Sequence, residues 1–285
     1  MTIVVTGATG QLGRLIVEGL LSTGVAPDQI VATARRPEAL DDFAARGIRV
    51  ARLDYTDPAS IAAALEGADK VALVSSSEVG QRFPQHKAVI DAAVAAGVGQ
   101  LVYTSATAAS TTALLVAPEH KATEEYLVAS GIPHTILRNN WYTENYASTA
   151  RQAAETGTVV ASAGKGRVAS ATRKDYADAV AAVLTTEGHL GKTYELSGDT
   201  AWDFDELAAA ISAHYGRPVV YTPVSTEEHA AALTAAGLDA GTVGFVTGLD
   251  ANIRDGLLDV TTGDLSRLIG RPTTPLAEGL ADALK

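Results

Sequence analysis

Three glycines near the start of the chain, Gly7, Gly10 and Gly13, have the spacing of a turn that binds phosphate groups. A short apolar run precedes them and a helical pattern follows, so the turn joins a strand to a helix. Gly7 permits the tight turn, Gly10 lets backbone N–H groups approach a pyrophosphate, and Gly13 lets the helix pack closely. The amino terminus of the helix adds partial positive charge. We therefore expect a dinucleotide to contact Gly7, Thr9, Gly10, Gln11, Leu12 and Gly13.

Two arginines, Arg35 and Arg36, follow the second predicted strand, about 20 residues beyond the glycines. Proteins that prefer NAD commonly carry an acidic residue there, which holds the ribose 2′-hydroxyl. A guanidinium group instead attracts the 2′-phosphate that a carboxylate would repel. The pair predicts NADPH as the cofactor. The alternative, that one or both arginines are solvated surface charges, stays open.

Polar side chains also follow the third, fourth and fifth predicted strands. Asp54 either hydrogen-bonds the adenine amino group or caps the helix that follows Pro58. The serines and threonines either line the ribose and nicotinamide or form local turns. The cofactor contacts expected at these positions are Asp54, Tyr55, Ser75, Ser76, Ser77, Thr104 and Ser105.

A parallel sheet would bring these side chains together, because ligands of open α/β sheets bind at the carboxyl ends of the strands. Strand-like runs alternate with helical patterns as far as about residue 138, which is typical of repeated βαβ units. The pattern predicts an α/β fold with a Rossmann-type, doubly wound parallel sheet. The expected strands are 3–6, 29–34, 48–53, 70–75, 100–105 and 134–137, and the expected helices are 12–22, 60–66, 84–96 and 119–130.

The pattern changes after residue 140, where shorter strand-like segments mix with helices. We expect residues 1–140 to form an NADP-binding Rossmann domain and residues 141–285 to form mainly a smaller α/β lobe that binds substrate. The two are expected to be interwoven, with part of 141–200 returning to the Rossmann sheet.

Composition excludes several classes of partner and site. The 285 residues carry a formal net charge of −11, which argues against nucleic acid, because that partner requires clustered basic residues. The chain has no cysteine, so disulfides and thiolate metal sites are excluded, and no metal is expected. The first strand starts almost at once and no apolar run is long enough for a membrane helix, so we expect a cytoplasmic protein with no membrane partner. The oligomeric state, including a homodimer, is left open.

Several separated segments resemble the NmrA-like group of atypical short-chain dehydrogenases/reductases, over almost the whole chain. They are residues 7–13, Arg35, residues 137–146 and residues 170–175. Within that group the sequence looks like the bacterial NADPH:quinone oxidoreductases and the triphenylmethane reductases, which share segments like 185–189 and 202–207. The resemblance implies NADPH as the reductant, no flavin, and a small planar conjugated acceptor in the cleft between the lobes.

The sequence departs from the wider superfamily at residues 117–121. Typical members carry Tyr-x-x-x-Lys, whereas this chain reads Ala117-Pro-Glu-His-Lys121. Lys121 matches the lysine that holds the nicotinamide ribose and is therefore expected to be both a catalytic and a cofactor-binding residue. The alternative, a surface lysine whose charged end stays in water, is left open. No phenol stands at Ala117, so we expect hydride transfer to an acceptor, such as a quinone, that can take its proton from water. His120 is either a proton donor or structural.

An aromatic segment follows the sixth predicted strand. Trp141 and Tyr142 either stack a flat substrate, with Asn139 or Asn140 bonding its carbonyl, or pack the junction of the lobes. From these features we expect Lys121, Asn139 and Tyr142 to be catalytic and Asn140, Trp141 and Asn145 to bind substrate. The helix near residue 84 either covers the cleft or presents an ordinary helix face there. The residues concerned are Gln81, Arg82, Phe83, Gln85 and His86.

The sequence thus favours NADPH-dependent reduction of a quinone or a similar conjugated acceptor by direct hydride transfer. The alternative is a sensor of the NmrA type that binds NAD(P) without turnover and regulates a partner protein. The missing tyrosine is compatible with either function, and the physiological acceptor is not identified by the sequence.

Overall fold

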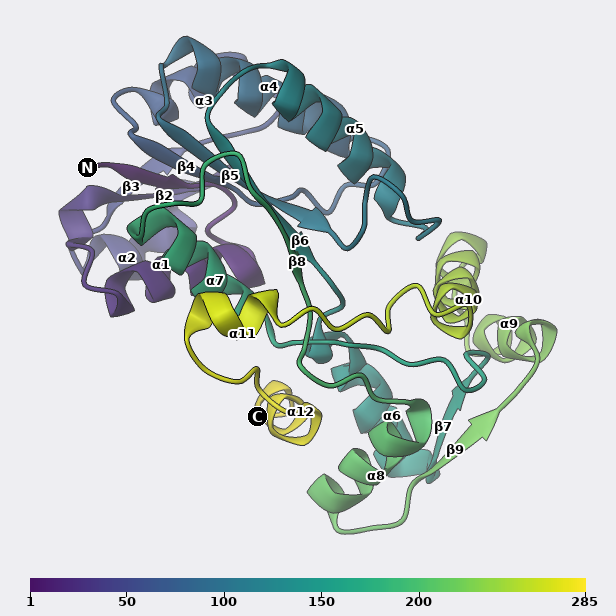
Figure 1. Ribbon diagram of the computed structural model, residues 1–285. Helices are drawn as coiled ribbons and strands as arrows, with labels where there is room; N and C mark the ends of the chain where they lie inside the picture. Colours follow the sequence, from purple (N-terminus) through teal and green to yellow (C-terminus); the bar gives the residue numbers. More distant parts are fainter.

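Seven parallel strands form the main sheet of the computed structural model, which describes residues 1–285 (Figure 1). Their order is β3-β2-β1-β4-β5-β6-β8, so the order reverses between β1 and β4. That reversal is where open α/β sheets bind ligands. The predicted Rossmann-type fold is confirmed. The strands are β1 (Ile3–Val5), β2 (Ile30–Ala34), β3 (Arg49–Arg52), β4 (Lys70–Leu73), β5 (Gln100–Ala106), β6 (His134–Asn139) and β8 (Thr193–Leu196).

Helices cover both faces of this sheet (Figure 1). Along β1, Ile3 and Val5 face one core and Val4 faces the other, because successive side chains of a strand point to opposite faces. A strand buried on both sides must be apolar throughout, which explains the continuous apolar run. One face carries α1 (Gln11–Ser22), α2 (Asp41–Ala44), α7 (Arg173–Thr185) and α11 (Asp264–Ile269), and the other carries α3 (Pro58–Leu65), α4 (Arg82–Ala95) and α5 (Ala117–Ala129).

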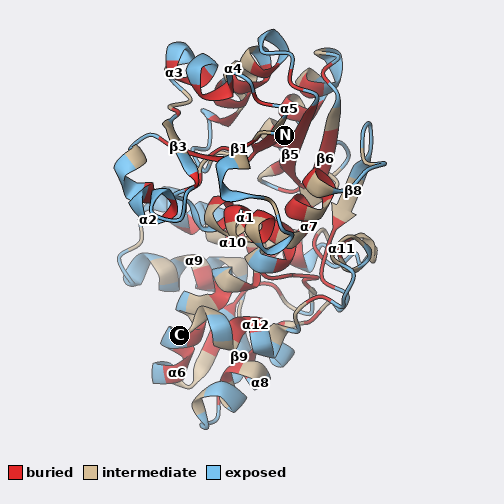
Figure 2. Cartoon of the chain, turned by 90° about the vertical axis from the view of Figure 1, so that its left-hand side faces the viewer, coloured by how far each residue is buried: buried red, intermediate tan, exposed pale blue.

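A smaller lobe packs around its own core, which contains Tyr146, Trp202 and Phe204. Figure 2 shows buried residues along the sheet and on the inner sides of the helices of both lobes. None of the helices combines the length and apolar character needed to cross a bilayer. The lobe consists of α6 (Ala147–Thr156), β7 (Thr158–Ala161), α8 (Phe204–Tyr215), β9 (Val220–Pro223), α9 (Thr226–Ala235), α10 (Ala240–Arg254) and α12 (Leu276–Ala283), and β7 pairs in parallel with β9.

The chain crosses between the lobes more than once. After α6 and β7 it returns to the large domain, where α7 packs along α1 and β8 pairs with β6. Small residues permit the close helix contact: a Cβ added at Gly19 of α1 would lie 3.2 Å from the Cβ of Ala181. Residues 173–196 therefore belong to the sheet domain, although they follow the first elements of the small lobe.

The start of α1 leaves no room for a side chain at Gly13, because a Cβ there would overlap the Gly7 carbonyl oxygen. We predict that Gly13→Ala lowers the free energy of unfolding by about 1–3 kcal/mol, the usual range for overpacking, and abolishes dinucleotide binding. Gly244→Ala is the matched control, because Gly244 also lies in a helix but has no atom within 4 Å of the added Cβ. The control should be neutral or more stable by up to about 1 kcal/mol. Urea unfolding measures both variants, and equal stabilities would contradict the packing argument.

Candidate functional site

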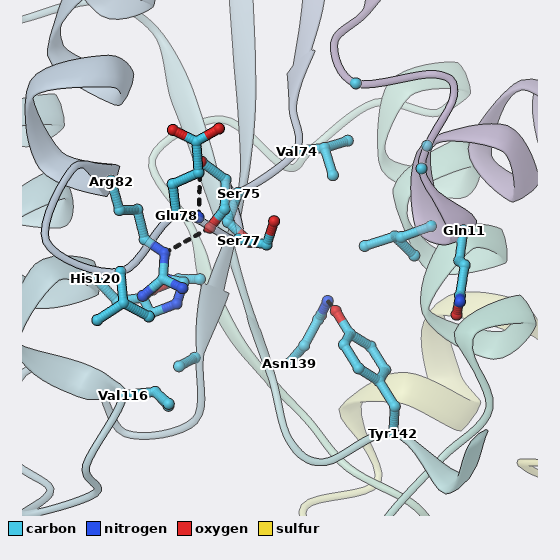
Figure 3. Close-up of a pocket in the computed structure, with 18 of the residues that line it drawn as sticks. Gln11, Val74, Ser75, Ser77, Glu78, Arg82, Val116, His120, Asn139 and Tyr142 are labelled. Carbon is cyan, nitrogen blue, oxygen red and sulfur yellow. Dashed lines mark hydrogen bonds between the residues drawn. The ribbon is translucent and has the colours of Figure 1, made fainter. Parts of the chain in front are cut away.

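A cavity of about 820 Å³ lies at the carboxyl ends of the sheet strands and extends to the small lobe (Figure 3). Its volume lies in the range of cofactor and substrate sites. The lining combines the glycine turn after β1, the ends of β2 to β6, the start of α5, and single residues of α7 and α10. All the site residues predicted from the sequence line this cavity except Arg36, Thr104 and Lys121.

The glycine turn has the geometry of a phosphate cradle. Gly7 has a φ of +61°, in the region that favours glycine, and its carbonyl accepts a hydrogen bond of 2.9 Å from the Gly10 N–H. Helix α1 begins at Gln11, with no side chain capping it and no acidic residue in its first turn. The first N–H groups of the helix therefore remain available to an anion.

Arg35 and Asp54 line the same end of the cavity. Arg35 is exposed at the end of β2, and its Nη1 lies 3.5 Å from Oε1 of Glu78, whereas Arg36 does not line the cavity. Asp54 accepts hydrogen bonds from the backbone and hydroxyl of Thr56, and these bonds hold the pKa of its carboxyl below its usual value. The cap of α3 is Asp57 rather than Asp54, so the capping alternative for Asp54 is excluded.

Hydrogen bonds from neighbouring elements fix the loop after β4. The Ser75 N–H donates to the Thr104 hydroxyl at 2.9 Å, and the Ser76 N–H donates to Nε2 of His86 at 3.0 Å. Thr104 therefore holds the loop and does not line the cavity, and its predicted contact with the cofactor stays a prediction. Ser105 lines the cavity, but its hydroxyl donates to Glu124 at 2.6 Å and is held there.

Tyr55 lines the cavity as an anchored ring rather than as an acid. Its hydroxyl donates to the Thr6 hydroxyl at 2.8 Å, and burial raises its pKa to about 12. Of the two asparagines after Arg138, Asn140 is engaged at both ends of its amide: its Nδ2 donates to the Leu258 carbonyl at 3.2 Å and its Oδ1 accepts from the Trp141 N–H at 2.8 Å. Asn140 thus joins the two lobes, and its second Nδ2 hydrogen has no partner within the protein.

The aromatic segment is partly structural. Tyr142 packs edge-on against Tyr176, with ring centroids 5.3 Å apart, and the Arg173 guanidinium lies 4.6 Å above its ring. Arg173 also donates to Oδ1 of Asn145 at 2.8 Å. Tyr142 is therefore fixed between α7 and the segment after β6, while Trp141, which is only partly buried, lines the cavity.

Two buried amide oxygens in the lining, Asn139 Oδ1 and Gln85 Oε1, have no hydrogen-bond partner within the protein. Such an acceptor costs about 1–3 kcal/mol when it is left unsatisfied. Both oxygens therefore fit a ligand that presents N–H donors, as the carboxamide of nicotinamide does. Together with the glycine cradle, they show that the lining is suited to a nicotinamide dinucleotide.

Comparisons with known proteins agree with this geometry. A family model described as NAD(P)H-binding matches residues 7–187. The chain is 48% identical to quinone oxidoreductase 2 of Escherichia coli (strain K12), over 98% of this chain and 97% of that protein. The chain belongs to the NAD(P)H-binding family. The resemblance to quinone and triphenylmethane reductases that was predicted from separated motifs is confirmed.

Solved structures of related proteins have the same fold throughout. The NADPH complex of the Escherichia coli NADPH-dependent quinone oxidoreductase is 46% identical, with a TM-score of 0.95 and 100% of both chains covered. The Citrobacter sp. triphenylmethane reductase complexed with NADP(H) is 38% identical, with a TM-score of 0.94 and 100% of both chains covered.

In this NAD(P)H-binding protein, α5 presents His120 rather than Lys121 to the cavity. Lys121 is exposed and does not line the cavity, whereas His120 is buried and does. Consecutive helix residues point about 100° apart, so both cannot face the same wall. The expectation that Lys121 holds the nicotinamide ribose stays a prediction. The lining residues that carry no sequence prediction are chiefly Glu78, Val116, Arg173, Phe245 and Leu258.

Two histidines beside the cavity are held neutral. Burial, with a further contribution from the nearby Arg82 guanidinium, lowers the pKa of both His86 and His120 to about 3. An unfolded chain binds these protons with a pKa near 6.5. Below that pH the unfolded state gains protons that the folded state does not, so stability is lost as the pH falls.

We predict that the free energy of unfolding decreases by about 1.4 kcal/mol for each of these histidines between pH 7.5 and 5.5. Urea unfolding at the two pH values measures the decrease. His120→Gln should show a smaller decrease than the wild type, by about the contribution of one histidine. Identical decreases in the two proteins would contradict a neutral, buried His120.

Proposed function

We propose that this chain reduces quinones or similar planar conjugated acceptors with NADPH, by direct hydride transfer. The observation that carries the proposal is that one cavity contains both the glycine cradle and an apolar wall. That wall comprises Leu114, Val116, Trp141, Phe245 and Leu258. The related Escherichia coli quinone oxidoreductase and Citrobacter triphenylmethane reductase support the same acceptor class.

The polar end of the cavity would hold the cofactor. The cradle from Gly7 to Gly13 suits the pyrophosphate, Arg35 suits a 2′-phosphate, and Asn139 Oδ1 suits the carboxamide. When bound, NADPH supplies a hydride. The residues of the chain orient the two ligands, because both must lie in the same 820 Å³ volume.

The apolar wall would hold the acceptor. Trp141 and Phe245 offer aromatic faces for a flat molecule, and a lining of this kind excludes water from the reacting atoms. Ala117 is buried and supplies no proton donor in the place of the superfamily tyrosine. A quinone suits such a site, since its reduced oxygen is stabilised by conjugation and takes a proton from water.

We predict that NADPH binds at least tenfold more tightly than NADH, a difference of about 1.4 kcal/mol. Arg35→Ala should weaken NADPH binding by that amount, because the guanidinium–phosphate contact is lost, and should leave NADH binding within twofold. Arg36→Ala is the matched control and should change neither affinity by more than twofold, because Arg36 lies outside the cavity. Calorimetric titration measures all these affinities, and equal losses in the two variants would remove Arg35 from the cofactor site.

We predict that Trp141→Ala raises the KM for quinones by about 2- to 13-fold, which corresponds to about 0.5–1.5 kcal/mol of aromatic stacking. NADPH binding should stay within twofold, and Trp141→Phe should restore most of the affinity for quinone. The assay follows NADPH absorbance with a panel of quinones and dyes. NADPH binding without oxidation of NADPH by any acceptor would refute the proposed reductase and support the sensor function instead.

A further inference from the structure

His120 occupies an unusual position for a histidine in a helix. It lies in the first turns of α5, is 6% exposed, and lines the cavity next to Arg82. Figure 3 shows the two side chains together, across the cavity from Gln11 at the start of α1. The imidazole therefore stands on the wall opposite the cradle, where an acceptor would meet it.

One nitrogen of this imidazole is engaged within the protein and the other is not. Nδ1 lies 2.7 Å from the hydroxyl of Tyr103, a fully buried residue of β5. Nε2 has no hydrogen-bond partner in the protein, and it is not among the fully buried unpartnered atoms, so it is accessible. An accessible ring nitrogen without a protein partner, in a residue that lines a cavity, is available to a ligand.

The Tyr103 contact fits one of the two neutral tautomers of the imidazole. Burial raises the pKa of the Tyr103 phenol well above its usual value, so the phenol keeps its proton and is able to donate it to Nδ1. Burial also keeps the imidazole neutral by lowering its pKa. A neutral imidazole that accepts at Nδ1 is protonated at Nε2. In this tautomer the N–H group faces the cavity.

We propose that His120 is a catalytic residue whose Nε2–H donates a hydrogen bond to the carbonyl oxygen of the acceptor. This role rests on the proposed reductase function. The acceptor is reduced by the hydride of NADPH, negative charge develops on its oxygen, and a donor already aimed at that oxygen stabilises the charge. The imidazole keeps its proton, because losing it would create an imidazolate anion. Water supplies the proton that completes the hydroquinone.

Arg82, Glu119 and His86 determine the electrostatic surroundings of His120. Arg82 of α4 is buried, donates from Nε to the Ser76 carbonyl at 2.7 Å, and lies 3.7 Å from the Glu119 carboxylate. His86, also on α4, packs edge-on against the ring of Tyr103 with centroids 5.2 Å apart and is itself neutral. Arg82 is the only formal positive charge in this group, and the Glu119 carboxylate offsets it, so an oxyanion would depend on the Nε2–H donor itself.

Kinetics of His120 variants test the proposal. His120→Leu should lower kcat for quinones by about 100-fold or more, as the loss of an oxyanion donor does, and should leave the NADPH dissociation constant within twofold. His120→Gln, whose amide can place an N–H near the Nε2 position, should recover most of the loss. Tyr103→Phe should lower kcat only a few-fold, because it removes the hydroxyl contact at Nδ1 and leaves the imidazole in place. A kcat of His120→Leu within threefold of the wild type would overturn the proposal.

A second measurement does not depend on activity. In ¹⁵N NMR spectra of the wild-type protein, Nε2 of His120 should carry the proton and Nδ1 should not, with the resonance assigned by its loss in His120→Gln. The opposite tautomer would overturn the proposal even if kinetics supported it. A wild-type protein that binds NADPH but reduces no quinone would overturn the reductase function and this role together. Normal wild-type turnover with an unaffected His120→Leu would overturn this role alone.

Discussion

Burial of a parallel sheet on both of its faces is the constraint on which the site depends. Because helices cover both faces, the only polar backbone surface that the strands offer a ligand lies at their ends. All the strands of this sheet run in the same direction, so the residues after β1, β2, β3, β4 and β6 meet along one edge. Side chains distant in the sequence therefore line one cavity.

A buried charge network ties α5 to that edge. Arg138 of β6 binds Glu124 of α5 at 2.6 Å and Glu195 of β8 at 2.8 Å, and Glu124 also accepts from Ser105 of β5. The register of the sheet makes this possible, since Arg138 lies opposite Ser105 on one side and Glu195 on the other. Removing one partner of a buried pair costs about 3–5 kcal/mol. The network therefore fixes the helix that carries His120 relative to the strand that carries Asn139.

The small lobe supplies what the sheet edge lacks. Polar groups dominate the cradle, whereas Phe245 of α10 and Leu258 contribute apolar surface from the other side of the cavity. Asn140 holds this arrangement together, because its amide accepts a hydrogen bond from the backbone N–H of the next residue, Trp141, and donates one to the Leu258 carbonyl. The division explains how one cavity accommodates a charged cofactor and a flat conjugated acceptor.

The sequence by itself determined the parallel sheet, the glycine turn at the start of α1 and NADPH as the cofactor. Their signals are local: apolar strands, glycines at fixed spacing, and arginines directly after a strand. It did not predict α6, whose buried residues are all alanines, or α10, which brings Phe245 to the cavity. An alanine side chain buries little apolar area, so the inner face of such a helix is established by what it packs against.

The tertiary structure alone decided which face of α5 meets the ligand. The buried residues of that helix include His120, Thr123 and Glu124, which are polar, so apolar spacing could not identify the inner face. The Tyr103 hydroxyl and Arg138 satisfy these groups from β5 and β6. A polar residue can face inward only where a distant partner meets it, and no pattern along the chain encodes that partner. For this reason the sequence favoured Lys121, and the packed structure placed His120 in the cavity.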